Sequence, residues 1–372
     1  MTLQLLREWP PGYGGVERVA HELAVVWGGA VYSLDAQPQR RREQDPLPVS
    51  YARQRLPRLA IGRLLLPLPS WRLLCLLGSS QPLHGHLPSP AVLLLLLLAR
   101  VLRPGRRVTA HWHCFLERSP GLSGWLYSGY QWFAQRVVPF FSGVVTTSPQ
   151  LAAELERCGC LPARIHVLPC CLSAEQEVAA LALKAREPDL QVEQNLMTVL
   201  FIGRLDSYKR VDWLLQALAD VPSPWRLDVV GDGPKRASLQ TLAQDLFGVS
   251  ERVQFHGRLN EAAKLKCLAQ ADVLVLPSDR SNEAFGIVQL EAMAAAIPAL
   301  AFQRPRSGMG WVGELQQLTW SQQPQELAQV LSLLQSQPQW RVALGLEARK
   351  RYMRLFQRDV WQRQLARLDL AV

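Results

Sequence analysis

The sequence is short of several features that would place it in a specialised class. Its 372 residues include only seven cysteines, an odd number without regular spacing, which excludes a disulfide scaffold and favours reduced thiols in the cytosol. Residues 1–8 carry Arg7 after a short apolar run and not before it, so they are not expected to form a signal peptide. An apolar run at 91–99 has nine residues, well short of the about 20 that cross a bilayer. It predicts a helix buried against a sheet.

Acidic residues are scarce in the first half of the chain, and lysine is absent from it. Residues 1–172 hold 18 Arg against 9 Asp plus Glu, a net charge of +9, which leaves +1 for the remainder. Much of the excess lies between Arg40 and Arg72, interleaved with leucine. Such a stretch can bind an anionic membrane surface or form an ordinary solvated basic face of a helix, and both interpretations stay open because prolines interrupt the helical phase. No nucleic-acid motif accompanies the charge, so no nucleic-acid partner is expected.

A short segment in the second half of the chain is the most informative part for function. Two carboxylates, Glu283 and Glu291, flank a stretch that contains Phe285 and Gly286. If a helix begins at Phe285-Gly286, the backbone N–H groups of Gly286 and Ile287 are free and carry the positive end of the helix dipole, which suits a phosphate. Glu291 then lies one to two turns into the helix, where a sugar hydroxyl can reach it, and Glu283 lies at its mouth.

Four segments of the chain resemble the signature segments of retaining glycosyltransferase family 4, the glycosyl transferases group 1, which have the GT-B fold. They are a Gly-Gly loop, a Gly-Arg-Leu…Lys segment, a Val-Gly-x-Gly-Pro turn and a Glu-x7-Glu pair, at residues 11–18, 201–210, 229–234 and 283–291. All four occur in the family's order over roughly 280 residues. The ordered set is therefore far more specific than any one member, since Gly-Gly alone also marks plain turns.

The resemblance and the residue pattern agree on the fold class. The alternation of short apolar runs with helical stretches predicts parallel α/β units, and the length of the chain predicts two domains. Strands are expected at 108–110, 143–147, 198–202, 225–230, 253–255 and 273–276. The resemblance implies α/β architecture of the GT-B type, with two Rossmann-like domains whose parallel sheets face across a cleft.

The expected domain boundaries follow from the same family resemblance and from a polar, charged stretch in the middle of the chain. An acceptor-binding domain is expected at 1–172, a linker at 173–195 and a nucleotide-sugar-binding domain at 196–350. A C-terminal helix at 351–372 is implied to pack back on the N-terminal domain. Ligands in open α/β sheets bind at the carboxyl ends of the strands, where the signature segments are expected.

The implied function is transfer of a hexose-type sugar, with retention, from a nucleotide-diphosphate sugar to a hydroxyl of a sugar, glycolipid or polyprenyl-linked acceptor. Polysaccharide or glycolipid synthesis is the expected setting, either free in the cytoplasm or peripheral at the inner face of the membrane. The chain has no Asp-x-Asp motif, so no metal or other cofactor is expected. Arg204 and Lys209 would instead neutralise the diphosphate, Arg with two parallel hydrogen bonds and Lys as a point charge.

The resemblance also assigns the remaining site residues. Glu283 is expected to hold hydroxyls of the donor sugar, and Glu291 those of the ribose. The residues expected to bind the donor are Gly14, Gly15, Arg204, Lys209, Gly231, Glu283, Phe285, Gly286, Ile287 and Glu291. Those expected to act in catalysis are His111, Glu283, Arg204 and Lys209.

Histidines form two His-x-His pairs, His84 with His86 and His111 with His113. His111 falls where the family has a histidine that reaches the donor sugar, and it is expected to position that sugar near the anomeric carbon. A hydrogen-bonded structural histidine is the plain alternative. A zinc site built from these histidines with Cys114 is another, because residues two apart on a strand share a face.

Two segments depart from the family pattern, and other functions stay open. Cys170-Cys171-Leu172-Ser173 stands where the family usually has Asn-Gly-Val-Asp, and residues 304–310 replace a Gly-rich turn. An inert GT-B scaffold, a GT-B sugar-nucleotide epimerase and a basic protein that binds a membrane surface without chemistry are the alternatives.

Overall fold

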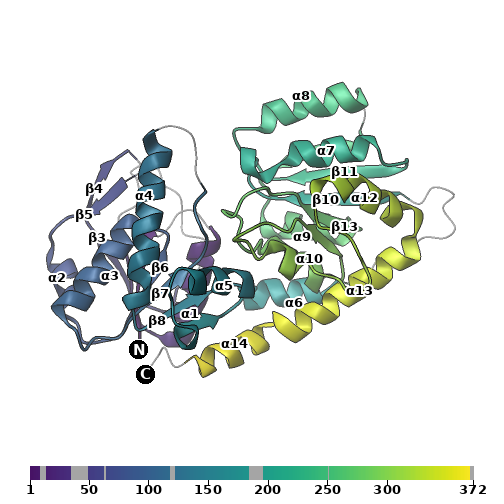
Figure 1. The fold of residues 1–372 in the computed structure, drawn as a ribbon. Coiled ribbons are helices and arrows are strands. Elements are labelled where there is room, and N and C mark those ends of the chain that lie inside the picture. Colours follow the sequence, from purple (N-terminus) through teal and green to yellow (C-terminus); the bar gives the residue numbers. More distant parts are fainter. Residues whose placement is uncertain are drawn as a thin grey trace. The chain divides into compact units, whose positions relative to one another are not determined.

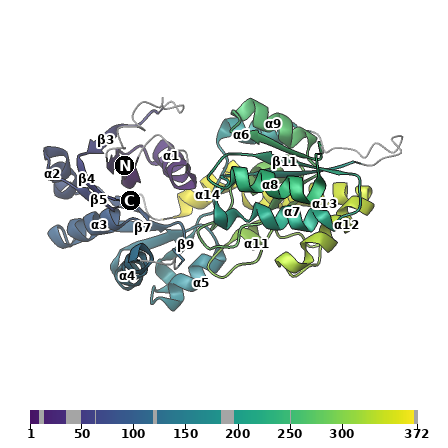
Figure 2. The same cartoon turned by 90° about the horizontal axis from the view of Figure 1, so that it is seen from above.

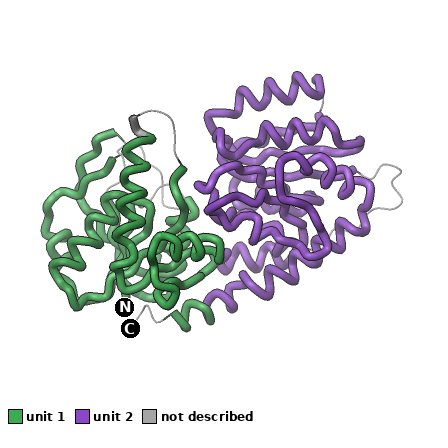
Figure 3. The backbone as a smooth tube through the Cα atoms, in the orientation of Figure 1, with its two compact units in different colours: residues 1–169, 363–372 green, residues 170–362 purple. Residues whose placement is uncertain are grey.

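The structure is a computed structural model that describes residues 1–8, 14–34, 49–62, 64–117, 122–183, 196–249 and 251–368. It divides into two compact units, distinguished by colour in Figure 3. Unit 1 comprises residues 1–169 and 363–372, and unit 2 comprises residues 170–362. The last helix, α14 (Arg358–Arg367), therefore belongs in part to each unit.

Unit 1 is built on a parallel sheet of seven strands in the order β3-β2-β1-β6-β7-β8-β9 (Figure 1). A two-stranded antiparallel hairpin, β4–β5, is added to it. In chain order its elements are β1 (Leu3–Glu8), α1 (Gly15–Trp27), β2 (Val31–Leu34), β3 (Arg53–Leu56), β4 (Arg58–Ile61), β5 (Leu64–Pro67), α2 (Trp71–Gly78), β6 (Leu83–Leu87), α3 (Pro90–Leu102), β7 (Val108–Trp112), α4 (Leu122–Val137), β8 (Gly143–Thr146), α5 (Pro149–Arg157) and β9 (Ile165–Val167).

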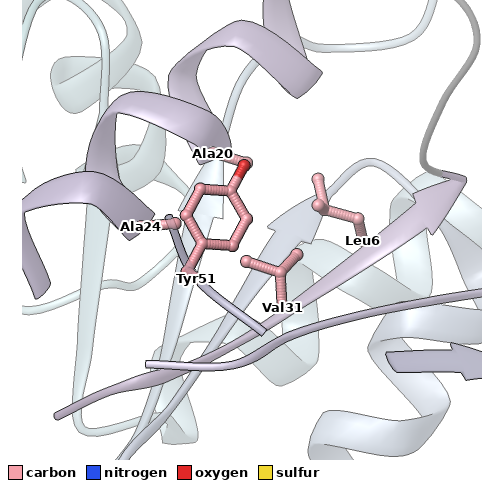
Figure 4. Packing of buried hydrophobic residues seen from close by; sticks show 5 residues of the cluster. All are labelled: Leu6, Ala20, Ala24, Val31 and Tyr51. Carbon is pink, nitrogen blue, oxygen red and sulfur yellow. The ribbon is translucent and has the colours of Figure 1, made fainter. Parts of the chain in front are cut away.

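The core of unit 1 forms where α1 packs on the central strands. Figure 4 shows Tyr51 lying against Ala20 and Ala24 of α1, with Leu6 and Val31 of the sheet beside them. The small alanines let the aromatic ring approach the helix closely. The Tyr51 hydroxyl stays satisfied, because it lies 2.9 Å from His21 Nδ1.

The apolar run at 91–99 forms the buried helix that the sequence predicts. α3 starts with Ser89, whose hydroxyl accepts a hydrogen bond from the Val92 backbone N–H, and with Pro90 in the first turn, both favourable at a helix N-terminus. Its buried face packs against β6, β1 and β7. None of the helices among the described residues is both long and apolar enough to span a bilayer.

The basic, leucine-rich stretch is not the single helix that one of its interpretations assumed. Residues 53–56 form β3, residues 58–61 and 64–67 form the strands β4 and β5 of the hairpin, and α2 follows at Trp71–Gly78. Pro57 and Pro67 stand at strand borders, where a residue without an N–H is tolerated. Arg40 and the rest of residues 35–48 lie outside the described part of the chain.

Unit 2 has a parallel sheet of five strands in the order β12-β11-β10-β13-β14. In Figure 1, α7 and α8 lie on one side of β10 and β11, and α9 and α10 lie on the other; Figure 2 shows the same elements from above. The elements are α6 (Ala174–Ala182), β10 (Met197–Ile202), α7 (Val211–Ala219), β11 (Trp225–Val230), α8 (Arg236–Phe247), β12 (Val253–Gly257), α9 (Glu261–Gln270), β13 (Val273–Leu276), α10 (Val288–Ala294), β14 (Ala299–Ala301), α11 (Met309–Val312), α12 (Leu327–Ser336), α13 (Pro338–Leu355) and the start of α14.

The strands of unit 2 follow from their composition. All six residues of β10 are buried, as expected for a central parallel strand that is covered on both faces. All six strands that the sequence predicts are present, with ends that differ by one or two residues. The α/β fold class is therefore confirmed in both units.

The segment that the sequence assigned to a linker contains a helix. α6 begins with a capping box, in which Ser173 and Gln176 satisfy each other's backbone N–H groups. It belongs to unit 2, where it packs against α10. Residues 184–195 lie outside the described part of the chain.

Candidate functional site

Lys209 and Glu283 form a largely buried ion pair in unit 2. Lys209 ends a short 3-10 turn after β10, and Glu283 lies in the loop between β13 and α10. The Lys209 ammonium donates a hydrogen bond to Glu283 Oε2, with side-chain exposures of 8% and 18%. Two residues that the sequence predicts for the donor site are thus brought together from positions 74 residues apart.

The loop that carries Glu283 is fixed by a residue that the sequence analysis did not identify. The Ser307 hydroxyl donates a hydrogen bond of 2.6 Å to the Glu283 backbone carbonyl, and the Gly308 N–H donates one of 2.7 Å to the Ala284 carbonyl. Both residues belong to the segment 304–310, which departs from the family pattern. This segment therefore supports the Glu283 loop from the side of β14, a role that only the tertiary contacts reveal.

The helix after this loop begins later than the sequence suggested. α10 starts at Val288 and not at Phe285-Gly286, and its first turn is closed by a hydrogen bond from the Gln289 N–H to the Gly286 carbonyl (2.9 Å). Gly286 has φ +72°, and a Cβ there would lie 2.4 Å from a Leu276 methyl group. The left-handed glycine turns the chain before the helix, so Gly286 and Ile287 lie in the preceding turn.

Phe285 anchors the same turn in the core. Its side chain is buried, and its ring meets the Phe356 ring edge-on at a centroid distance of 5.9 Å. The Gln289 amide donates a hydrogen bond of 2.8 Å to the Phe285 carbonyl. The ring contact and the hydrogen bond thus hold this turn in place, and Phe285 positions the residues next to it in the chain.

Glu291 lies in a second charged cluster, on the inner face of α10. It is buried, and its Oε2 is 2.8 Å from Lys264 Nζ on α9. The same ammonium is 2.9 Å from Glu261 Oε2, which also accepts a hydrogen bond from the Gln176 amide on α6. The sequence predicted Glu291 but missed Lys264, because a cation from a neighbouring helix carries no local motif.

These three helices surround a pocket of about 220 Å³. Apolar side chains of α9 form part of the wall, and the charged cluster forms another part. The lining residues are Glu175, Gln176, Ala179, Ala180, Glu261, Ala262, Lys264, Leu265, Leu268 and Glu291.

The turns after β10 and β11 are held together so closely that glycine is required. Gly231 has φ +136°, and a Cβ there would lie 1.8 Å from the Gly203 carbonyl oxygen. The Gly203 N–H donates a hydrogen bond of 3.0 Å to the Val230 carbonyl. Gly231 therefore shapes the backbone beside Arg204, at the carboxyl end of the sheet.

Arg204 is an exposed cation at this end of the sheet. Its side chain is 66% exposed, and its Nε lies 3.3 Å from Asp206 Oδ2. The neighbouring Arg210 is committed elsewhere, since it pairs with Asp212 and stacks 3.7 Å over the Trp213 ring. Arg204 is thus free to reorient toward an anion without breaking a buried contact.

The predicted site residues of unit 1 have different surroundings. Gly14 is the N-cap of α1 and Gly15 its first residue, while residues 9–13 of the Gly-Gly loop lie outside the described part. Burial raises the pKa of Glu17, and hydrogen bonds from its own backbone and that of Gly14 oppose the rise. His111 lies within β7 and is completely buried, and the residue that follows the strand at its carboxyl end is His113. The sequence placed His111 nearer to the loop than it is.

The architecture defines the class of protein. Two parallel-sheet α/β units with motifs at the carboxyl ends of their strands are the components of the GT-B fold. A structure of HepE from Anabaena in complex with UDP is similar, with a TM-score of 0.71, 17% sequence identity and coverage of 98% of both chains. WaaG, a glycosyltransferase involved in lipopolysaccharide biosynthesis, is similar over 100% of both chains, with a TM-score of 0.66 and 18% identity.

The chain belongs to the family 4, group 1 glycosyltransferases. Residues 13–176 match the family described as Glycosyltransferase Family 4, and residues 185–351 match that described as Glycosyl transferases group 1. A D-inositol 3-phosphate glycosyltransferase of Streptosporangium roseum is 32% identical over 232 residues, which are 58% of this chain and 52% of that protein. The matching segments span about half or less of the length of the curated relatives. Family and fold, expected from the four signature segments, are thus confirmed.

Proposed function

We propose that the protein is a retaining glycosyltransferase that moves a hexose-type sugar from a nucleotide-diphosphate sugar to a hydroxyl acceptor. The observation that carries the proposal is the presence in unit 2 of the Lys209–Glu283 pair and the Glu291–Lys264 cluster, within the segment that matches the glycosyl transferases group 1. The likeness to HepE, which is described in complex with UDP and with UDP-glucose, supports a nucleotide sugar as the donor.

The two charged clusters suit different parts of the donor molecule. Glu291 lines the pocket and offers carboxylate oxygens to a pair of neighbouring hydroxyls, the pattern of a ribose. Lys209 and Arg204 offer positive charge for a diphosphate. In the absence of donor the Lys209 charge is balanced by Glu283, and a diphosphate would take over part of that role while Glu283 accepts hydrogen bonds from the sugar.

The transfer step is proposed to need no metal ion. The acceptor oxygen bonds to the anomeric carbon as the bond from that carbon to the phosphate oxygen breaks. The acceptor proton passes to the departing phosphate on the same face of the sugar, so the configuration is retained. Negative charge grows on the leaving group, and the cations of Lys209 and Arg204 stabilise it more in the transition state than in the ground state.

An acceptor attached to a lipid fits an exposed apolar surface of unit 1. This hairpin–α2 patch consists of Leu59, Ile61, Leu64, Leu68, Trp71 and Leu74, all more than a third exposed. Trp71 is 77% exposed, and Arg58 and Arg72 accompany the patch. Exposed Trp and Leu beside Arg suit the interface of an anionic membrane, so we propose a peripheral membrane association and a glycolipid or polyprenyl-linked acceptor, in polysaccharide or glycolipid synthesis.

The side chain of His111, which the sequence predicts to position the donor sugar, is completely buried in unit 1. Its contact with the donor sugar stays a prediction. A His111→Asn variant that keeps full donor affinity and turnover would show that this predicted contact is wrong.

A thermal-shift screen against UDP-, GDP- and ADP-sugars tests the donor proposal. A ligand at about 100 times its dissociation constant adds roughly 2.7 kcal/mol of apparent stability. We expect one nucleotide to stabilise the wild type, and the shift to be lost in Glu291→Ala and reduced in Arg204→Ala. Asp245→Ala, which removes an exposed carboxylate of α8, is the matched control and keeps the shift. A folded wild type that no nucleotide sugar stabilises would favour an inert scaffold.

A further inference from the structure

Four of the seven histidines of the chain are gathered in one buried column of unit 1. His84 and His86 lie on β6, His111 lies on β7 and His113 follows it. The strand register pairs His86 with His111, and the rings of His111 and His113 stack at a centroid distance of 4.1 Å. An apolar core does not need four imidazoles in contact, and burying them is costly unless their nitrogen atoms are satisfied.

Outer hydrogen bonds fix which nitrogen of two of these rings carries the lone pair. The Gln4 amide donates to the Ala20 carbonyl at 3.2 Å, which turns its oxygen toward His86 Nε2 at 2.9 Å. His86 Nε2 must therefore be the donor, and its Nδ1 carries the lone pair.

Thr109 has the corresponding effect on His84 when its hydroxyl donates to a backbone carbonyl. The Thr109 hydroxyl lies 2.8 Å from His84 Nδ1 and 3.5 Å from the Leu83 carbonyl, to which it can donate. His84 Nδ1 is then the donor, and the lone pair is on Nε2. Metal-binding histidines are held in this manner, with the non-ligating N–H donated to an outer partner.

The third ring supplies the nitrogen atoms that complete the group. His111 Nδ1 is 3.4 Å from His84 Nε2, and His111 Nε2 is buried without a hydrogen-bond partner in the described part of the chain. Two nitrogen ligands about 2.0–2.1 Å from a tetrahedral zinc ion are themselves roughly 3.4 Å apart. One potential ligand atom from each of His84, His86 and His111 lies within 4.8 Å of the others, which is close enough for one ion to lie among them.

We propose that His84, His86 and His111 bind one divalent transition-metal ion of the zinc type in the core of unit 1. His113 is not part of this group; its Nε2 lies 2.9 Å from His86 Nδ1, a hydrogen bond that binding of the ion by His86 would replace. Cys114 is not part of the group among the described residues.

The proposed ion is structural. A His111 that binds it would not contact the donor sugar, so this inference and the predicted sugar contact of His111 exclude each other. Its ligands belong to β6 and β7, and Gln4 of β1 holds one of them, so the ion would tie three neighbouring strands of the sheet together. This inference does not rest on the proposed transferase activity, whose charged groups Lys209, Glu283 and Glu291 lie in unit 2.

Metal binding by the full chain tests the proposal. Any polyhistidine tag is removed, the protein is freed of metal with a chelator, and Co²⁺ is added as a spectroscopic probe, followed by Zn²⁺ in competition. We expect one ion per chain, with the visible absorption of tetrahedral Co²⁺ that zinc then removes. His84→Asn and His111→Asn should lose this signal, while His166→Asn, a histidine of β9 outside the group, should keep it.

A second variant distinguishes loss of metal binding from loss of folding. Thr109→Val has nearly the same shape and keeps every ligand but removes the outer partner of His84. We expect it to fold and to bind the ion about 10–100-fold more weakly. The proposal is wrong if the folded wild type takes up neither ion, or if His111→Asn binds the ion as tightly as His166→Asn does.

Discussion

Lys209 is the residue whose surroundings say most about what the site can do. A buried ammonium is stable only beside a negative charge, and Glu283 supplies it. The pair therefore ties the stability of unit 2 to the same groups that would handle a donor. Substitutions must be designed to separate the two effects.

Removing Lys209 alone should destabilise the protein, and removing the pair should not. Lys209→Met leaves the Glu283 carboxylate without its partner, and breaking a buried pair costs about 3–5 kcal/mol. The double variant Lys209→Met/Glu283→Gln should recover most of that stability but keep turnover at least about 100-fold down, since charge stabilisation of the leaving group is lost. Denaturant melts and donor turnover measure the two effects. A double variant with wild-type turnover would contradict the proposed role.

Cysteine reactivity reports on the packing around the loop that carries Glu283. Burial and the charge of Glu283 raise the pKa of Cys170 to about 12, and burial with Cys158 raises that of Cys160 to about 11. Because a raised pKa keeps the thiol protonated, neither should react at about pH 8, where only thiolate is nucleophilic. Exposed Cys75 should react first. Mass spectrometry after brief alkylation of the native protein checks the order, and early labelling of Cys170 would show that this core is open.

At the scale of elements, the turns between strands and helices determine where the site residues lie. Their conformation is also the hardest part of the structure to predict from the sequence. The strands and α3 were predictable because continuous apolar runs leave little choice. The start of α10 was placed too early, because the sequence does not show that Gly286 adopts φ +72°. Lys264 and Ser307 were missed because their partners are distant in sequence and appear only after the helices pack.

The close approach of the β10 and β11 turns predicts a large effect of one methyl group. Gly231→Ala would place a Cβ 1.8 Å from the Gly203 oxygen and would strain a residue at φ +136°. We expect a loss of about 3 kcal/mol or more from the clash and the strain together. Gly129→Ala is the control, since its Cβ meets nothing within 4 Å inside α4, where alanine is favoured by about 1 kcal/mol. Equal melting temperatures of the two variants would contradict the claim that the β10 and β11 turns require glycine at position 231.

At the scale of the whole molecule, the uneven charge of the chain gains a structural setting. Residues 1–172 carry +9 of the +10 net charge, and unit 1 also carries the hairpin–α2 patch. The sequence suggested the membrane interpretation from arginine and leucine alone. The structure shows which leucines are exposed, and that information is not present in the pattern.

The patch predicts salt-sensitive binding to anionic vesicles. Flotation with vesicles that contain phosphatidylserine should recover the wild type, with less recovery at high salt. Trp71→Ser/Leu74→Ser should weaken binding about tenfold or more, because two exposed apolar side chains are removed. Val249→Ser, an exposed apolar position of unit 2, should have no effect. Equal recovery of all three proteins would rule out the patch as the contact surface.

The central claim is that this chain transfers a sugar from a nucleotide-diphosphate donor, and turnover followed by NMR tests it most directly. The donor that stabilises the protein is incubated with it, with and without simple sugar and lipid-linked acceptors, and the anomeric proton is followed. We predict release of the nucleoside diphosphate and a product with the donor's anomeric configuration. Turnover should fall at least about 100-fold in Lys209→Met/Glu283→Gln and stay unchanged in Asp245→Ala. A folded wild type that binds the donor but neither hydrolyses nor transfers it, or a product of inverted configuration, would contradict the account.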